Sequence, residues 1–272
     1  MEDSEAGATE KALSLIKIFG SRFRRMAFTL HPNGLAGESR GKSSNQSWAA
    51  NEAIKFYRTN NALLAEVLIT TMDGMYKPDT WSLLLTKPAD THLLPSYFEL
   101  ISNMHEADPI NAPTTMYVPP IAFDRNIHKI PALVRLADIL WCCAGLSGDH
   151  SKGSVRIPTS VYTLPMTLVE NVEGWDTGPD SIGEDIHMYL KCSLALRGNL
   201  NTRVVYSPAS QCDVDSGING LRGYLAALVS RFNQALRHSW GALDVGFTVR
   251  GLFEPNPLHE KQYGHIQLKG AK

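Results

Sequence analysis

The chain has 272 residues, of which 43% are apolar and 19% are charged, and its formal net charge is -1 at neutral pH. This length and composition are enough to bury a core, and they exclude a disordered or fibrous protein. The balanced charge gives no basic excess of the kind that nucleic-acid-binding surfaces carry.

The N-terminal third of the chain predicts helices joined by a polar loop. Residues 1–9 are expected to form a frayed tail, and the apolar spacing over 11–26 predicts a helix, with a short strand at 26–30. The opening string is acidic and small, so it does not have the pattern of a signal peptide. A glycine-bearing loop covers 31–43, and Ser44 is predicted to begin the next helix.

The segment Val67 to Met72 is a short apolar, β-branched run that ends at Asp73. Such a run is typical of a buried strand in an α/β sheet, with an acidic residue at its C-terminal edge. The apolar runs of the chain are all much shorter than the roughly 18 residues that a membrane span requires.

The remainder of the chain predicts helices alternating with strands. Helices are expected over 95–104, 131–144 and 165–172, from near 181, and over 221–240, and strands over 160–164 and 203–206. The predicted apolar faces are Leu133, Val134, Ala137, Leu140 and Trp141 in the helix 131–144, and Ile186, Tyr189, Leu190 and Leu194 in the helix that starts near 181. This alternation indicates an α/β fold with a mixed, mostly parallel sheet flanked by helices.

Four carboxylates lie at the ends of predicted elements, where α/β proteins often carry their catalytic and ligand-binding residues. Asp73 ends a strand, Asp90 follows a turn, and Glu184 and Asp185 open a helix. Oxygen ligands of this kind suit Mg²⁺ or Mn²⁺, and a carboxylate at such a position can deprotonate a hydroxyl group. The simpler alternatives are a helix-capping box, in which Ser181 and Glu184 cap each other's backbone, and a turn role for Asp90.

Two sets of polar residues could bind phosphate groups. Arg231, Gln234, Arg237 and His238 share one face of the last predicted helix, which is either a solvent-exposed face or a site for a diphosphate. Lys42 and Asn45 lie where a glycine-bearing loop leads into a helix, an arrangement that can contact phosphate.

Several longer strings resemble the fungal branch of the family 2 glycosyltransferases, which includes relatives of cellulose and chitin synthases. The matching strings are GESRGKSSNQSWAA, ADTHLLPSYFELI, PPIAFDRN, RLADILWCCAGLSG, GSVRIPTSVYTLP, EGWDTGPDSIGEDIHMYLKCSLAL, VYSPASQC and RFNQALRHSWGALDVGF. They cover roughly residues 10 to 253 in the order found in the family. The resemblance implies a GT-A fold and the transfer of a sugar from a nucleotide sugar, most simply a UDP-sugar, with inversion and with Mn²⁺ or Mg²⁺ as cofactor.

The resemblance also implies roles for individual residues. Asp73 and Asp90 match the DxD aspartates that bind the metal, and Asp185, with Glu184 beside it, matches the catalytic base. Gln234 and Arg237 match the QxxRW motif on the donor side, although His238 replaces its tryptophan. Lys42 and Asn45 are assigned to the donor side from their place in the loop before a helix. Gly174, Trp175 and Trp240 fall on the acceptor side.

One departure from the family separates the two metal-binding aspartates. The family string reads like VLITTMDADTHLLPSYF, whereas this chain carries residues 74–88 between Asp73 and Ala89. Gly-Met-Tyr at 74–76 is compatible with the intron start GTATGT, and Pro-Ala at 88–89 is compatible with a terminal AG. The inserted segment is therefore interpreted as a retained intron, with a surface loop as the alternative.

The expected domain organisation is a tail at 1–9, a glycosyltransferase domain at 10–253 and a second tail at 254–272. Relatives carry a first strand before this region and membrane helices after it, so the resemblance implies a partial chain whose full-length relatives are anchored with the catalytic domain on the cytosolic face. A catalytically inactive fragment of the same fold is the alternative function.

Overall fold

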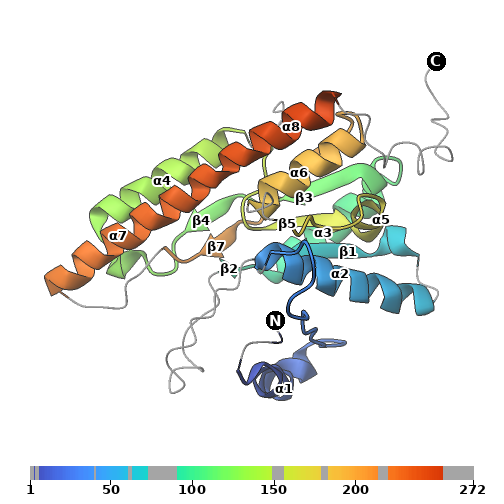
Figure 1. The fold of residues 1–272 in the computed structure, drawn as a ribbon, viewed down its shortest axis with the longest axis horizontal. Helices are drawn as coiled ribbons and strands as arrows, with labels where there is room; N and C mark the ends of the chain where they lie inside the picture. Colours follow the sequence, from blue (N-terminus) through green and yellow to red (C-terminus); the bar gives the residue numbers. More distant parts are fainter. Residues whose placement is uncertain are drawn as a thin grey trace.

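The computed structural model describes residues 3, 6–39, 41–60, 63–72, 91–148, 156–178, 183–213 and 220–253. These residues form a mixed α/β fold in which two small sheets are flanked by helices (Figure 1). The α/β class predicted from the sequence is therefore confirmed.

The larger sheet has four strands, in the order β1 (Leu68–Thr71), β5 (Tyr162–Pro165), β3 (Thr115–Val118) and β6 (Asn201–Val204). All four side chains of β3 and of β5 are buried, because these strands lie in the middle of the sheet. β5 runs antiparallel to both of its neighbours, and β3 runs parallel to β6.

The smaller sheet has three strands, in the order β2 (Thr91–His92), β7 (Ala209–Gln211) and β4 (Ile121–Phe123). β2 runs antiparallel to β7, and β4 runs parallel to it. The expected majority of parallel pairings is not found among the described strands, since three of the five pairings are antiparallel. The apolar pattern of a buried strand such as β5 predicts burial, but it does not encode strand direction.

Helices cover both sides of the strands. In the view of Figure 1, α4, α6, α7 and α8 lie on one side and α2 lies on the other. The helices are α1 (Ala8–Phe19), α2 (Lys42–Thr59), α3 (Pro95–Ala107), α4 (Ala132–Ser147), α5 (Met166–Asn171), α6 (Glu184–Ala195), α7 (Gly220–Ser239) and α8 (Leu243–Phe253).

The main core lies between the larger sheet and helices α5 and α6. Its buried side chains include Tyr162, Leu164, Leu168, Trp175 and Met188. Burying such side chains contributes about 1.5–3 kcal/mol each, so this region anchors the start of α6.

Several predicted boundaries differ from the structure. α1 begins at Ala8, which is buried, so the last residues of the expected tail belong to a helix. Residues 26–30 form no strand, and β3, β4, β7 and α8 were not predicted. These strands are only three or four residues long, and prolines at 113, 119 and 120 interrupt the region of β3 and β4.

Two helices turn unexpected faces toward the protein. Within α4, only Val134 and Asp138 are buried, whereas Leu133 and Leu140 are more than half exposed. The fully buried face of α6 carries charged residues, and the apolar face predicted from its sequence is only half-buried. Among the helices of the described residues, none combines the length and apolar content needed to cross a membrane.

Candidate functional site

The starts of helices α2 and α6 meet in the structure. Lys42, the first residue of α2, forms an ion pair with the Oε1 atom of Glu184, the first residue of α6. Glu184 is buried, and the Lys42 side chain is 31% exposed. The sequence placed Lys42 on the donor side and Glu184 in the catalytic pair, and the structure brings these two residues into contact.

Asn45 lies one turn further along α2. Its Nδ2 atom donates a hydrogen bond to the carbonyl oxygen of Gly41 at 2.9 Å. Ser43, between Lys42 and Asn45, donates to the carbonyl oxygen of Asp176 at 2.6 Å. The first turn of α2 is therefore attached to the loop that carries Gly174, Trp175 and Asp176.

Asp185 accepts two backbone hydrogen bonds. Its Oδ1 atom accepts from the N–H of Ile186, and its Oδ2 atom accepts from the N–H of Ser160, both at 2.9 Å. Ser160 has a φ of 59°, a left-handed conformation that is uncommon for a residue other than glycine. The carboxylate thus holds a tight turn directly before β5, and each of its oxygens keeps further accepting capacity.

A chain of four alternating charges lies behind Glu184 and Asp185. His187 donates from Nε2 to Asp176 at 2.8 Å and from Nδ1 to Asp244 at 2.7 Å. Lys191, one turn further along α6, donates to Asp176 at 2.5 Å and to the carbonyl oxygen of Gly174 at 2.9 Å. We call Lys191, Asp176, His187 and Asp244 the α6 network.

The charges of the α6 network stabilise one another. Burial alone would lower the pKa of His187, but the hydrogen bonds and charges of Asp176 and Asp244 raise it to about 9. Burial opposes the ionisation of Asp176, but hydrogen bonds from His187 and Lys191 and their charges outweigh it and lower the pKa of Asp176 to about 2. His187 is therefore an imidazolium cation at neutral pH.

The predicted acceptor-side residues before α6 are part of this packing. Gly174 has a φ of 73°, and a Cβ atom there would lie 3.3 Å from the hydroxyl oxygen of Ser47 on α2. Trp175 is 3% exposed, and its indole N–H donates to the hydroxyl oxygen of Tyr162 at 2.7 Å. Trp175 thus supports the site from within the core and offers no stacking surface to solvent.

The predicted donor-side residues of α7 face α4. Arg231 donates to Asp138 of α4 at 2.7 Å and to the Oε1 atom of Gln234 at 2.6 Å. The ring of His238 lies 5.3 Å from that of Trp141, also on α4. The described contacts of this face outside α7 are with α4, and the side chains of Arg237 and Trp240 lie outside the described part of the structure.

A second buried carboxylate lies beside Asp138. Burial, followed by the hydrogen bond and the charge of Asp138, raises the pKa of Asp213 to about 8. The Asp213 backbone is fixed by Asn126, which bonds both its N–H and its carbonyl oxygen. The ion pair of Asp138 with Arg231 holds α7 against α4 and explains why α7 turns its polar face inward.

The predicted metal ligands Asp73 and Asp90 lie outside the described residues. Their described neighbours are tied together, because Thr163 of β5 bonds Thr70 of β1 at 2.8 Å and Tyr97 of α3 at 2.9 Å. Within the described ranges, no group of three or more His, Cys, Asp or Glu side chains could hold a metal ion.

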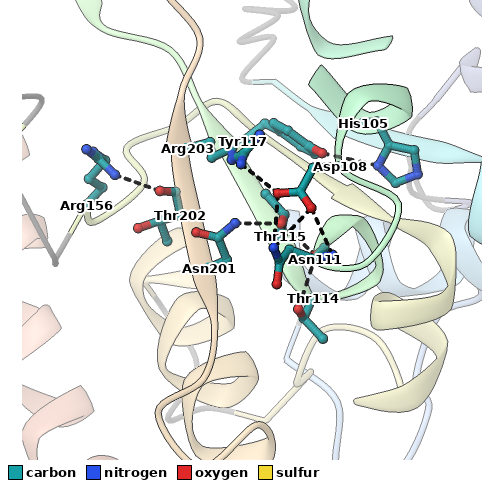
Figure 2. A network of polar contacts seen from close by, with 10 residues as sticks. All are labelled: His105, Asp108, Asn111, Thr114, Thr115, Tyr117, Arg156, Asn201, Thr202 and Arg203. Atoms are coloured by element: carbon teal, nitrogen blue, oxygen red, sulfur yellow. Dashed lines mark hydrogen bonds and ion pairs between the residues drawn. The ribbon is translucent and has the colours of Figure 1, made fainter. Parts of the chain in front are cut away.

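A different polar cluster, which we call the strand-edge network, lies where β3 and β6 begin (Figure 2). Asp108 bonds Arg203 at 2.7 Å and Asn111 at 3.0 Å, and Asn201 donates to Thr115 at 3.0 Å. Ligands of α/β folds bind at the C-terminal ends of parallel strands, so this cluster at their N-terminal ends has a structural role.

Reasoning from the sequence missed Asp176, His187, Lys191 and Asp244. The available signal was the spacing of Glu184, His187 and Lys191 at i, i+3 and i+7, which places three charges on one helix face. Such a stripe is usually solvated, and only the tertiary partners reveal that it is buried.

One of three comparisons with known proteins gives a match. The sequence matches the family described as glycosyl transferase family group 2 over residues 88–265, about two thirds of the chain. No curated protein and no solved structure matches the chain significantly. The matched region includes α6 and the α6 network, and the mixed α/β architecture is consistent with a GT-A-like fold.

Proposed function

Because the chain belongs to the glycosyl transferase family group 2, we propose that it transfers a sugar from a nucleotide sugar to an acceptor hydroxyl group with inversion. The acceptor oxygen bonds to the anomeric carbon as the bond from that carbon to the diphosphate breaks. The acceptor proton moves to the carboxylate of Asp185, which acts as the general base.

The contact between Lys42 and Glu184 is the observation that carries this proposal. It joins the loop-to-helix junction expected to bind diphosphate to α6, whose second residue, Asp185, is the proposed base. A bound diphosphate would compete with Glu184 for the ammonium group of Lys42, which is a natural partner for phosphate oxygens. We assign Lys42, Asn45, Gln234, Arg237 and His238 to the donor and Gly174, Trp175 and Trp240 to the acceptor, with Trp175 supporting the acceptor side from within the core.

We propose that Asp73 and Asp90 hold Mn²⁺ or Mg²⁺. The hydrogen bonds of Thr163 to Thr70 and Tyr97 support this assignment, because they fix the chain on either side of the two aspartates. A bound divalent cation supplies Lewis-acid stabilisation of the leaving diphosphate.

We also propose that the protein associates with a membrane, as the cellulose- and chitin-synthase-like fungal branch would. Exposed apolar side chains on α4, α7 and α8 support this, among them Leu140, Phe232 and Val249. α4 and α7 turn Asp138 and Arg231 inward, so their apolar side chains face outward. Large exposed apolar patches mark protein or membrane contacts.

A catalytically inactive protein of the same fold is the second candidate. Both oxygens of Asp185 already accept backbone N–H groups, and Gln234 is bonded to Arg231. Residues 74–88 also separate the two proposed metal ligands along the sequence.

Release of UDP from UDP-sugars in the presence of Mn²⁺ distinguishes the two candidates. Asp185→Asn is expected to lower turnover about 100-fold or more while UDP binding persists, because general base catalysis contributes about that much. Glu52→Gln is the matched control, since Glu52 is an exposed carboxylate on α2 that pairs only with Lys55 among the described contacts. Equal turnover in wild type and Asp185→Asn contradicts the assigned base, and UDP binding without any turnover favours the inactive protein.

Deleting residues 74–88 tests the metal ligands. The deletion restores Asp73-Ala89-Asp90, and two carboxylates so close in sequence can share one octahedral cation. We expect the deleted chain to gain Mn²⁺-dependent UDP binding by calorimetry, and Asp90→Asn in that chain to lose most of the gain. Equal binding by the intact and deleted chains would exclude the DxD assignment.

A further inference from the structure

His187 connects three segments that are distant in sequence. It lies two residues after Asp185 on α6, and its two ring nitrogens bond Asp176, in the loop after Gly174 and Trp175, and Asp244, in the first turn of α8. The side chains of His187 and Asp244 are 5% and 4% exposed. Phe247, one turn along α8 from Asp244, packs on the imidazole with ring centroids 4.1 Å apart.

The chemistry of the partners defines the state of the ring. Ionised carboxylates only accept hydrogen bonds, so an imidazole between two of them must donate from both nitrogens. Only the imidazolium form has two N–H donors. A neutral ring would present a lone pair to one buried carboxylate, which would repel it.

Asp244 also packs directly against the residue that precedes the catalytic pair. A Cβ atom built on Gly183 would lie 3.3 Å from the Oδ2 atom of Asp244. The N–H of His187 closes the first turn of α6 by donating to the carbonyl oxygen of Gly183 at 2.9 Å. The position of α8 is therefore transmitted to the first turn of α6 by contacts on both sides of Glu184 and Asp185.

We propose that His187 is a positioning residue for the glycosyl transfer proposed above: it locks the first turn of α6, with Asp185, onto α8. This inference rests on the proposed function and adds that α8 is part of the catalytic scaffold. His187 itself is buried and touches no substrate, so it acts only through the place that it gives Asp185.

The rate of UDP release and amide hydrogen exchange together test the proposal. In His187→Gln, which donates on one side only, we expect turnover to fall about tenfold to hundredfold with the donor KM little changed, because small misplacements of catalytic groups have effects of that size. Exchange should accelerate in residues 183–186 and 244–248 and stay unchanged in α3. His105→Gln is the matched control, because His105 also bonds on both nitrogens but lies in the strand-edge network (Figure 2).

The pH profile separates positioning from general stabilisation. Wild-type turnover should decline on the alkaline side as His187 loses its proton, near pH 9. His187→Arg keeps a cation with several donors, so it should recover turnover relative to His187→Gln and lose this alkaline decline. The charged groups that face the ring are Asp176, Asp244 and, through Asp176, Lys191.

The outcomes are distinct. Unchanged turnover and exchange in His187→Gln, or faster exchange spread evenly over the domain, overturn the positioning role. If His187→Gln does not fold, Asp244→Asn, which keeps the shape and an accepting oxygen, gives the same two readouts. If wild type shows no turnover, the proposed function fails, and exchange alone decides whether His187 holds α6 on α8.

Discussion

The two polar networks of this protein use similar residues and differ in what surrounds them. The α6 network places His187 and Asp244 at about one twentieth exposure and joins partners up to 57 residues apart. In the strand-edge network, the Arg203 and Asp108 side chains are 35% and 23% exposed (Figure 2). Arg203 and Asp108 are 95 residues apart, and other bonds of this network join residues three or four apart. The α6 network fixes helices α6 and α8 against each other, and the strand-edge network joins β6 to β3 and to the turn before β3.

The difference shows that burial determines how much an ion pair contributes to stability. An ion pair that is exposed to water contributes little to stability. A buried charge that loses its partner is strongly destabilising, because no water replaces the lost partner. The α6 network should therefore contribute more than the strand-edge network both to the stability of the fold and to its dependence on pH.

The largest expected effect is the loss of one buried partner. Asp244→Leu leaves the His187 cation with Asp176 alone, so the free energy of unfolding should fall by about 3–5 kcal/mol. Urea denaturation measures this, with Arg203→Met in the strand-edge network as the matched charge removal. Similar losses in the two variants would mean that burial does not distinguish the two networks.

The second effect is a loss of stability at alkaline pH. His187 has a folded pKa of about 9 against 6.5 in the unfolded chain, so its contribution is complete below pH 6.5 and disappears as the pH rises through 9. A rise of that size corresponds to about 3 kcal/mol. In urea denaturation, His187→Gln should lose this slope between pH 6.5 and 9, and a slope equal to that of wild type would contradict the assignment.

Asp213 adds a separate pH dependence to the free energy of unfolding. The Asp213→Asn variant removes it, so that the contribution of His187 can be measured alone. Its folded pKa of about 8 is raised from 3.8, so its contribution is complete below pH 3.8 and is lost as the pH rises through 8. Asp213→Asn should flatten stability between pH 4 and 8 and leave the His187 component intact.

A smaller effect is expected from a single methyl group. Gly183→Ala places a Cβ atom 3.3 Å from Asp244, so α6 and α8 must shift slightly, and we expect a loss of about 1 kcal/mol. Gly145→Ala, in α4, meets no atom within 4 Å and should stabilise the helix by up to about 1 kcal/mol. Thermal unfolding of both variants checks the opposite signs.

The smallest effect belongs to the strand-edge network. Asn201→Ala removes one neutral hydrogen bond to Thr115 that is 3.0 Å long, so stability should fall by about 1 kcal/mol. Turnover should be unchanged, because this edge of the sheet lies at the N-terminal ends of β3 and β6. A reduced rate would require a functional role for the network in Figure 2.

The sequence predicted the elements whose apolar pattern is clear from neighbouring residues alone. β1, α3, α4, α5 and α7 all lie close to their expected ranges. β3 and β4 were missed because prolines at 113, 119 and 120 interrupt the apolar pattern around them, and β7 was missed because its three residues show too little periodicity. α8 was missed although its string belongs to the family resemblance.

The site was predicted less completely than the fold. Lys42 and Glu184 were proposed separately and are in contact, whereas Gln234 and His238 face α4. His187 and Lys191 could not be recognised, because charged residues on a helix are usually solvated and their partner Asp176 lies outside the helix. Asp73 and Asp90 lie outside the described residues, so their roles stay predictions.

The order of Asp176, His187 and Asp244 along the sequence has a consequence for protein synthesis. Residues emerge from the ribosome at about 5–20 per second, and domains generally fold as units. Asp176 and His187 leave the ribosome well before Asp244, so a nascent chain holds the imidazolium with only one of its two carboxylates. The contact between α6 and α8 can form only after α8 has been translated, and a product that stops before residue 244 should be a target for proteolysis.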